Sequence, residues 1–217
     1  MIEALNIEKS FGNLKVLKGV TLRSDKAEVI SIVGASGAGK TTFLQVMGTL
    51  LRPDSGSLKI NGIDPFALNS RELARFRNQE IGFVFQFHHL LPEFTAKENV
   101  MLPSLIHDSD KARAEKRAKE LLEELGLKDR INHKPSELSG GEQQRVAIAR
   151  AIVNSPSILF ADEPSGNLDS KNKQEIHRLF LNLRDTHHLS VIIVTHDHDL
   201  AAMSNRTIEM ADGEILL

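Results

Sequence analysis

The sequence predicts an α/β fold whose core is an open, mainly parallel β-sheet. Four short apolar runs occur along the chain, and each is followed by a polar residue or a glycine-rich loop, a pattern typical of parallel strands buried on both faces. Segments with helical periodicity separate the runs, as crossovers between parallel strands require. Alternating residues near the N-terminus and a charged, helix-rich middle predict two additions, a small antiparallel β subdomain and a helical subdomain at 87–157.

The composition is that of an ordinary globular protein. The chain has 217 residues, 41% apolar and 26% charged, which suits one large domain or a core with an insertion. It has no cysteine, so disulfides, thiolate zinc sites and cysteine nucleophiles are excluded. Its 27 basic and 29 acidic residues give a net charge of −2, so nucleic acid is not an expected partner. No apolar run approaches the roughly 20 residues that cross a bilayer, so neither spanning nor secretion is expected, and any membrane role depends on another chain.

The N-terminal segments predict the antiparallel subdomain. Strands are expected at 2–10, 14–23 and 57–63, with Asn61-Gly62 as a hairpin turn signal after a turn-rich stretch at 54–56. Phe11 lies where the first strand ends. Its ring could stack on a nucleotide base or belong to the core, and its position leaves both open.

The first apolar run of the parallel sheet, 29–33, leads into a glycine-rich loop. The string Gly34-Ala35-Ser36-Gly37-Ala38-Gly39-Lys40-Thr41 matches the P-loop pattern G-x-x-x-x-G-K-[ST] and precedes a helix whose apolar stripe is Phe43, Val46, Met47, Leu50 and Leu51. Glycines let successive N–H groups surround phosphate oxygens, and the helix N-terminus adds positive partial charge. We therefore expect residues 34–42, which end at Thr42, to bind a nucleotide. Lys40 should reach the β- and γ-phosphates, and the Thr41 hydroxyl should bind Mg²⁺.

A polar helix at about 69–78 leads into the next apolar strand, 81–85, which ends at Gln86. The following segment, Phe87-His88-His89-Leu90-Leu91-Pro92, has more apolar side chains than an exposed loop usually carries. It either packs under the domain or forms a partner-binding patch. The two adjacent histidines have no third ligand nearby, so hydrogen-bonded surface or interface groups are favoured over a metal site.

The helical region contains two capping-box spacings, Thr95 with Glu98 and Ser139 with Glu142. Between them, 109–125 has one apolar stripe among charged residues, and Gly126 should end that helix. Gly140 and Gly141 leave the first turn after Ser139 bare, so a partner could approach its backbone N–H groups. Local spacing alone favours an ordinary capped helix here.

The third apolar strand, 157–161, is followed by Asp162-Glu163. Consecutive carboxylates repel one another unless a bound cation offsets the charge of one of them. Asp162 is therefore expected to hold Mg²⁺ through its water shell, and Glu163 to orient or deprotonate an attacking water. The alternative is a solvated acidic turn.

The last part of the chain repeats the strand-then-polar pattern. Asp169 should cap a helix whose apolar face includes Ile176 and Phe180, and the strand at 191–195 ends at His196. Strands 207–210 and 214–217 form a closing hairpin. In a parallel sheet the ligand crevice lies outside the carboxyl ends of the strands. The P-loop, Gln86, Asp162-Glu163 and His196 should therefore meet there and hydrolyse a nucleoside triphosphate, with His196 sensing the γ-phosphate.

At these motifs the chain resembles the ATP-binding cassette (ABC) ATPases along essentially its whole length. The matching motifs are Walker A at 34–41, the Q-loop at Gln86, the signature at 138–143, Walker B at 158–163, the D-loop at 165–169 and the switch histidine, His196. The resemblance implies one nucleotide-binding domain, 1–217. Its P-loop NTPase (RecA-like) core, with the β subdomain, is 1–86 and 158–217, and its helical subdomain, 87–157, carries the signature.

The resemblance also implies the cofactors and partners. ATP and Mg²⁺ bind at the P-loop, Phe11 stacks on the base, and Gln86 contributes to catalysis and contacts Mg²⁺. The signature residues Ser139, Gly140, Gly141 and Glu142 cover the ATP of a second copy in a sandwich dimer. Transmembrane permease subunits hold the chain at the cytoplasmic face of the inner membrane.

Within the family, the segments 86–100 and 135–137 look closest to ATPases of bacterial lipoprotein-releasing systems, so lipoprotein is the expected cargo. ATPases of MacB-type exporters and FtsE-type complexes are the alternatives. A soluble ABC ATPase acting on ribosomes or DNA is disfavoured, because the chain has one cassette and no basic surplus. A GTPase lacks the N-K-x-D string. The chain departs from the usual pattern at Phe11 (commonly Tyr), Ala27 (Gly) and Ser165 (Thr).

Overall fold

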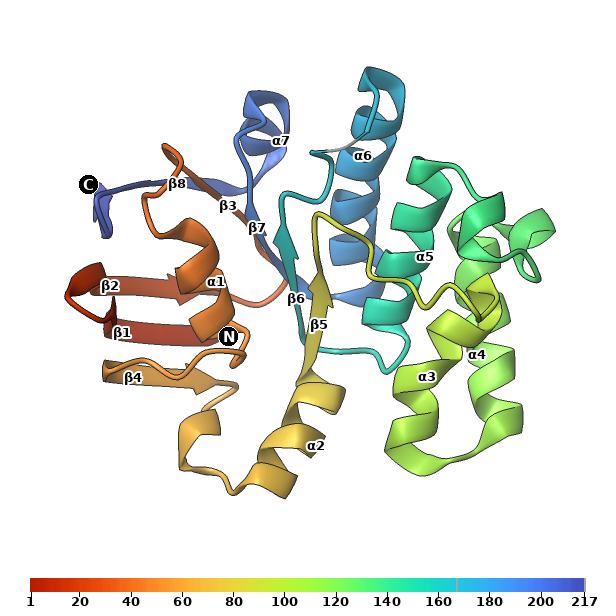
Figure 1. Cartoon of the computed structure of the whole chain (residues 1–217), viewed down its shortest axis with the longest axis horizontal. Helices are drawn as coiled ribbons and strands as arrows, with labels where there is room; N and C mark the ends of the chain where they lie inside the picture. The colour runs from red at the N-terminus through yellow and green to blue at the C-terminus, as the bar shows by residue number, and fades with distance from the viewer. Residues whose placement is uncertain (167, 217) are drawn as a thin grey trace.

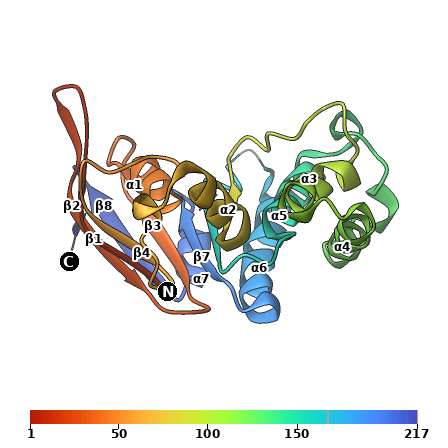
Figure 2. The same ribbon diagram turned by 90° about the horizontal axis from the view of Figure 1, so that it is seen from below.

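The computed structural model describes residues 1–166 and 168–216. Figure 1 shows a central sheet with a small second sheet on one side and a group of helices on the other. The view from below in Figure 2 keeps the same order, with β1, β2 and β4 at one end of the molecule and α3, α4 and α5 at the other.

The central sheet has six strands in the order β5-β6-β7-β3-β8-β9, and all neighbours are parallel except β8 and β9. This confirms the predicted α/β class. The second-last strand was expected only as half of a hairpin, but it also pairs with β3 and so widens the parallel sheet. Leu217 of the predicted hairpin lies outside the described residues. The strands are β3 (Val29–Val33), β5 (Ile81–Val84), β6 (Ile158–Asp162), β7 (Ser190–Val194), β8 (Arg206–Ala211) and β9 (Glu214–Leu216).

The smaller sheet is antiparallel, as predicted, and consists of β1 (Ile2–Phe11), β2 (Leu14–Ser24) and β4 (Ser55–Ile60) in the order β2-β1-β4. The sequence placed β4 at 57–63, which is wrong at both ends. Gly56, expected in a turn, has φ +94 and lies so close to the Asn6 carbonyl that a side chain there would collide with it. At the other end the predicted Asn61-Gly62 turn is present, and Ile63 makes only a single bridge to Ile60.

Four helices follow strands of the central sheet or connect to it: α1 (Lys40–Met47), α2 (Ser70–Glu80), α6 (Ser170–His187) and α7 (His198–Met203). α1 is shorter than its apolar pattern predicts. It ends at Gly48, whose backbone passes so close to the Phe83 ring that a Cβ would lie 2.8 Å from it, and Thr49 then turns left-handed with φ 60. Leu50 is 49% exposed, so its predicted place in the helix stripe is wrong.

The helical part contains α3 (Ala96–Asp108), α4 (Lys111–Glu124) and α5 (Gly140–Ile152), with short 3₁₀ turns at η1 (Pro65–Ala67), η2 (Lys128–Arg130) and η3 (Pro135–Glu137). Both predicted capping boxes form, at Thr95 and at Ser139. The apolar stripe of α4 is buried, as predicted. The boundaries of the helical subdomain at 87 and 157 stay a prediction.

The core divides into two apolar clusters on opposite faces of the central sheet. Alternate residues of one strand enter different clusters: Val191 and Ile193 pack with α3–α6, whereas Ile192 and Val194 pack with α1 and the small sheet. The central strands therefore read as continuous apolar runs because both of their faces are covered.

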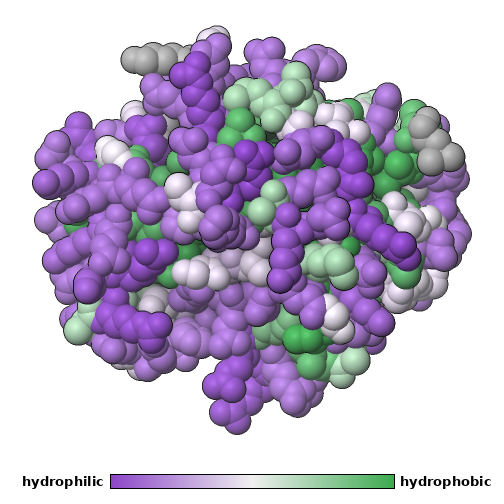
Figure 3. All heavy atoms as spheres, turned by 180° about the vertical axis from the view of Figure 1, so that it is seen from behind, coloured by the Kyte–Doolittle hydropathy of each residue, from purple (hydrophilic) through white to green (hydrophobic). Residues whose placement is uncertain are grey.

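The surface seen from behind is mainly hydrophilic, with apolar side chains scattered between polar ones (Figure 3). None of the helices in the part of the chain that the structure describes combines the length and the hydropathy needed to cross a bilayer.

Candidate nucleotide-binding site

The predicted site residues follow neighbouring strands of the central sheet. Gly34 comes directly after β3 and Glu163 directly after β6, whereas Gln86 and His196 come two residues after β5 and β7. Since these strands are parallel neighbours, their carboxyl ends share one edge of the sheet.

A cavity of about 600 Å³ lies at this edge. Phe11 is 52% exposed at its rim, which removes the alternative that its ring belongs to the core. Leu14 and Val16 of β2 also line the cavity but were not predicted as site residues. Only their place just after the turn that follows Phe11 could have suggested them. The cavity is lined by Phe11, Leu14, Val16, Gly34, Ser36, Gly37, Gly39, Lys40, Thr41, Thr42, Glu163, Val194 and His196. Of the predicted core-site residues, Ala35, Ala38, Gln86 and Asp162 lie outside this lining.

The P-loop leads into a helix whose N-terminus has no side-chain cap. Gly39 is left-handed at φ 96 and begins α1 without a side-chain cap, so no side chain of the helix start occupies the first N–H groups. The Lys40 ammonium donates hydrogen bonds to the carbonyl oxygens of Gly34 and Ala35, each at 2.8 Å. An anion in the cavity would therefore meet uncapped N–H groups and a cation held over the loop.

Thr41 and Asp162 meet across the sheet edge. The Thr41 hydroxyl donates a hydrogen bond to Asp162 Oδ1 at 3.1 Å. Burial raises the pKa of the Asp162 carboxyl, and the neighbouring Glu163 raises it further, against the Thr41 hydrogen bond and the charge of Lys40. No three His, Cys, Asp or Glu side chains among the described residues are arranged to hold a metal. A cation here would rest on one hydroxyl, one carboxylate, water and phosphate oxygens, which suits Mg²⁺.

Glu163 and His196 form a pair at the cavity wall. His196 Nδ1 lies 2.9 Å from Glu163 Oε2, and the histidine side chain is 68% exposed whereas the glutamate side chain is 19% exposed. Glu163 takes a left-handed φ of 46, with its N–H bonded to the Val194 carbonyl oxygen at 2.9 Å. A non-glycine residue held in this region is strained, and such strain concentrates at functional sites.

Gln86 lies beside the turn that follows β6. A Cβ on Gly166 would lie 3.2 Å from Gln86 Nε2, so the amide rests against the D-loop residues. Asn167 of the predicted D-loop lies outside the described residues.

The signature residues are far from this cavity in the same chain. None of them lines it, and α5 lies on the other side of the central sheet from α1 (Figures 1 and 2). The Ser139 hydroxyl accepts a hydrogen bond from Glu142 N at 3.3 Å, and Glu142 Oε2 accepts one from Ser139 N at 2.8 Å. This second bond, assisted by Arg130 at 2.9 Å, lowers the pKa of Glu142. The predicted capping box at Ser139 and Glu142 is therefore confirmed.

The two signature glycines have different surroundings. Gly140 is exposed, and a Cβ there would make an ordinary 3.5 Å contact with Leu168. Gly141 is buried, and a Cβ would lie 2.5 Å from Asn172 Oδ1 of α6. Gly141 therefore makes room for Asn172 of its own chain, and the expectation that the two glycines keep the helix start open to a partner stays a prediction.

The 87–92 segment is anchored to the domain but is not fully packed under it, and its role as a partner-binding patch stays a prediction. The Arg150 guanidinium donates hydrogen bonds to the carbonyl oxygens of His88 and His89, each at 2.8 Å, which anchors the segment to α5. Phe87 is nevertheless 65% exposed and Leu91 41% exposed.

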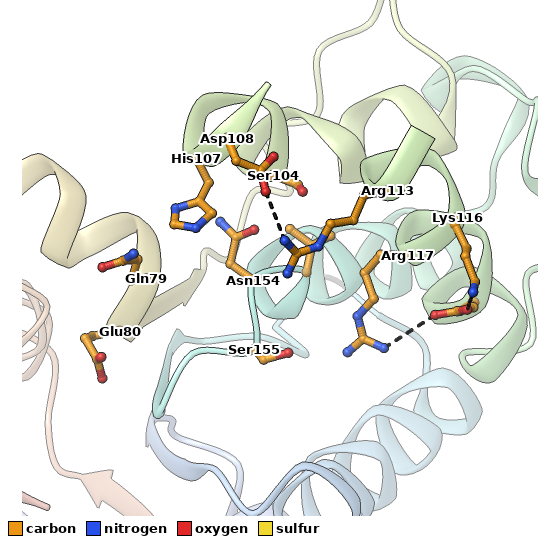
Figure 4. A pocket seen from close by; sticks show the side chains of 12 residues that line it. Gln79, Glu80, Ser104, His107, Asp108, Arg113, Lys116, Arg117, Asn154 and Ser155 are labelled. Carbon is orange, nitrogen blue, oxygen red and sulfur yellow. Dashed lines mark hydrogen bonds and ion pairs between the residues drawn. The ribbon is translucent and has the colours of Figure 1, made fainter. Parts of the chain in front are cut away.

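A second cavity, of about 630 Å³, lies among α2, α3, α4 and the end of α5 (Figure 4). Its three basic side chains are paired within the chain: Arg113 with Asp108 at 3.2 Å, and Lys116 and Arg117 with Glu120 at 4.0 and 3.9 Å. It contains none of the predicted site residues, so its size alone does not make it the candidate site.

Comparison with known proteins agrees with the geometry. The sequence profile of the ABC transporter family matches residues 17–166. The lipoprotein-releasing system ATP-binding protein LolD of Bacteroides fragilis is 56% identical over 216 residues, 100% of both chains. LolD of Porphyromonas gingivalis is 57% identical over 213 residues, 98% of this chain and 97% of the relative.

Solved structures give the same result. A dimeric structure of MJ0796, a bacterial ABC transporter cassette, has a TM-score of 0.91 at 41% identity, covering 100% of this chain and 97% of the other. A dimer of the cassette MJ0796 in a post-hydrolysis state with ADP and phosphate has a TM-score of 0.90 at 40% identity, with the same coverage. The predicted cassette fold and ABC ATPase activity are thereby confirmed. This chain belongs to the ABC transporter family, among the ATP-binding proteins of lipoprotein-releasing systems.

Proposed function

We propose that this chain is the ATP-hydrolysing subunit of an ABC transporter that releases lipoproteins from the inner membrane toward the outer membrane. The observation that carries the enzymatic part is the single cavity in which the P-loop faces the Glu163–His196 pair, whose side chains are 2.9 Å apart. The cargo follows from the relatives, which are named for lipoprotein release and match over the full chain.

The P-loop binds the triphosphate of ATP through its uncapped N–H groups and the Lys40 ammonium, and the exposed Phe11 ring stacks on the base. Lys40 exchanges its bonds to the Gly34 and Ala35 carbonyls for phosphate oxygens, which are stronger acceptors because they are charged. Thr41 and Asp162 would hold Mg²⁺, and Gln86 would contact it. When bound, Mg²⁺ supplies charge neutralisation to the phosphates.

Glu163 orients the attacking water and accepts its proton. The carboxylate is largely sheltered, which favours a directed hydrogen bond over bulk solvation. His196 contacts Glu163 on one side and reaches into the cavity on the other, so its ring can follow the γ-phosphate. Attack of the oriented water on the γ-phosphate breaks its bond to ADP and yields inorganic phosphate.

A second copy completes each site. The signature residues lie on the far side of the sheet from the P-loop of their own chain, and both reported structural neighbours are dimers. In the proposed dimer, Ser139 and Gly140 of one chain cover the ATP bound by the P-loop of the other.

The permease holds the dimer at the cytoplasmic face of the inner membrane. The exposed apolar side chains of Phe87 and Leu91 support a contact with a transmembrane partner, and Arg150 links this segment rigidly to the signature helix α5.

Purification of the chain from membranes of its own cell tests this proposal. We expect it to copurify with transmembrane subunits, and the reconstituted complex should release a lipoprotein from vesicles only when ATP is present. The same complex carrying Glu163→Gln is the matched control and should retain the lipoprotein. A chain that never copurifies with a membrane subunit would contradict the transport role while leaving the ATPase intact.

A further inference from the structure

A second polar cluster lies buried behind the Glu163–His196 pair. Ser165 Oγ and His177 Nε2 are 3.1 Å apart, and the same nitrogen is 3.9 Å from Asp197 Oδ2. Ser165 and His177 are each only 2% exposed. These three side chains come from the turn after β6, from α6 and from the start of α7.

The cluster bridges the two segments that carry the cavity pair. Ser165 lies two residues after Glu163, and Asp197 follows His196 directly. Asp197 is itself fixed, because it caps α7 by accepting hydrogen bonds from the N–H groups of residues 199 and 200 at 3.0 and 3.2 Å. The two strand-end segments are thus joined twice, once at the cavity wall and once beneath it.

Packing alone does not explain a histidine at 177. Burial lowers the pKa of the ring, against the charge of the nearby Asp197 carboxylate. Its Nδ1 is buried and has no hydrogen-bond partner among residues 1–166 and 168–216. An apolar ring would fill the same space without leaving a nitrogen unpaired. The hydrogen bond with Ser165 is therefore the interaction that a histidine at this position makes and an apolar ring would not.

We propose that His177 is a positioning residue: its bond to Ser165 and its contact with Asp197 hold the segment after Glu163 against the segment after His196, and so keep the two side chains aligned for water activation. The inference rests on the proposed hydrolytic role of Glu163 and His196. It assigns no contact with ATP to His177, so the effect should fall on turnover and spare nucleotide binding.

Steady-state kinetics and ATP binding of three full-chain variants test this inference. His177→Phe keeps a ring of similar size but removes the hydrogen bond, and Ser165→Ala removes only the partner hydroxyl. We expect each to lower kcat by about three- to tenfold with the Kd for ATP unchanged, since small misplacements of reacting groups act on the chemical step. His177→Gln presents an amide near the Nε2 position and should keep kcat within about twofold of the original.

The double variant Ser165→Ala/His177→Phe should be no slower than either single variant, because both remove the same contact. The inference is overturned if the two losses multiply, if His177→Phe and Ser165→Ala keep normal kcat, or if His177→Gln is as slow as His177→Phe. Glu163→Gln separates this inference from the proposed function: normal turnover in that variant removes the hydrolytic role itself, whatever the His177 variants do.

Discussion

Two helix N-termini of the chain contain glycine, Gly39 as the N-cap of α1 and Gly140 as the first residue of α5, and they differ in how their backbone donors are satisfied. At α1, Gly39 provides no side-chain cap, and the cavity lies within the same chain. At α5, Ser139 and Glu142 form a complete capping box that Arg130 reinforces, and no part of it lines that cavity. The first turn of α1 leaves its backbone N–H groups available for a ligand. At α5 the capping box already pairs backbone N–H groups of the helix start, so this helix presents a preformed surface. This difference fits the proposal that α1 binds the nucleotide and that α5 closes over a nucleotide bound by another chain.

The largest expected effect concerns the chemistry next to α1. Glu163→Gln should slow ATP turnover by ~10²–10⁴-fold, the usual contribution of a positioned general base, because the amide can still accept a hydrogen bond but cannot take a proton. ATP affinity, measured by equilibrium binding, should be unchanged. Undiminished hydrolysis would remove Glu163 from the role of base.

Lys40→Ala should act on binding at the α1 side. Loss of a charge-assisted phosphate contact should weaken ATP binding by about ten- to a hundredfold, measured as Kd by titration. The matched control is Lys97→Ala, since Lys97 is paired with Glu115 in the helical part, away from the cavity. A normal ATP affinity in Lys40→Ala would contradict the binding role of the P-loop.

Ser139→Arg should break the α5 side alone. The variant should fold and bind ATP normally, but its turnover should fall by about ten- to a hundredfold because the arginine obstructs closure over the partner's nucleotide. Mixing it with Lys40→Ala provides the sharper test. Each mixed dimer contains one intact P-loop facing one intact signature, so the mixture should regain activity that neither variant has alone. No recovery in the mixture, or full activity of Ser139→Arg by itself, would mean that α5 does not complete a site in another chain.

The two signature glycines give a smaller, structural effect. Gly141→Ala should destabilise the fold by about 1–3 kcal/mol, since its Cβ would press on Asn172 at 2.5 Å. Gly140→Ala should leave stability unchanged or raise it by up to about 1 kcal/mol, because alanine is the better helix former and the site has room. Thermal unfolding compares the two, and equal stabilities would contradict the different packing of these positions.

The smallest expected effect is a pH dependence of the α5 cap. Because the pKa of Glu142 is lowered in the fold, chiefly by the hydrogen bond from Ser139 N, its ionised form stabilises the native state. This stability is complete above the ordinary pKa of a glutamate and is lost as pH falls through the lowered one. Glu142→Gln should therefore be less stable than the original by about 0.5–1 kcal/mol at neutral pH. The difference between the two denaturation curves should vanish in strong acid, and a difference that persists there would exclude the charge as its cause.

Much of the site could be predicted because its signals are local. The P-loop spacing, the carboxylates after β6 and the histidine after β7 each follow a continuous apolar run, and parallel pairing brings strand ends together. The errors arose where a distant segment decided the local structure. The Phe83 ring meets Gly48 and helps to end α1, and the Asn6 backbone draws Gly56 into β4.

The sequence by itself determined the candidate residues for the chemistry, the caps at Thr95, Ser139 and Asp169, and that one edge of the sheet collects the site, since periodicity and capping depend on near neighbours. Only the tertiary structure decided that Glu163 and His196 touch at 2.9 Å, that His177 joins Ser165 beneath them, and that α5 faces away from its own P-loop. These are contacts between segments far apart in the chain. Their geometry depends on how whole helices pack on the sheet, which no local pattern encodes.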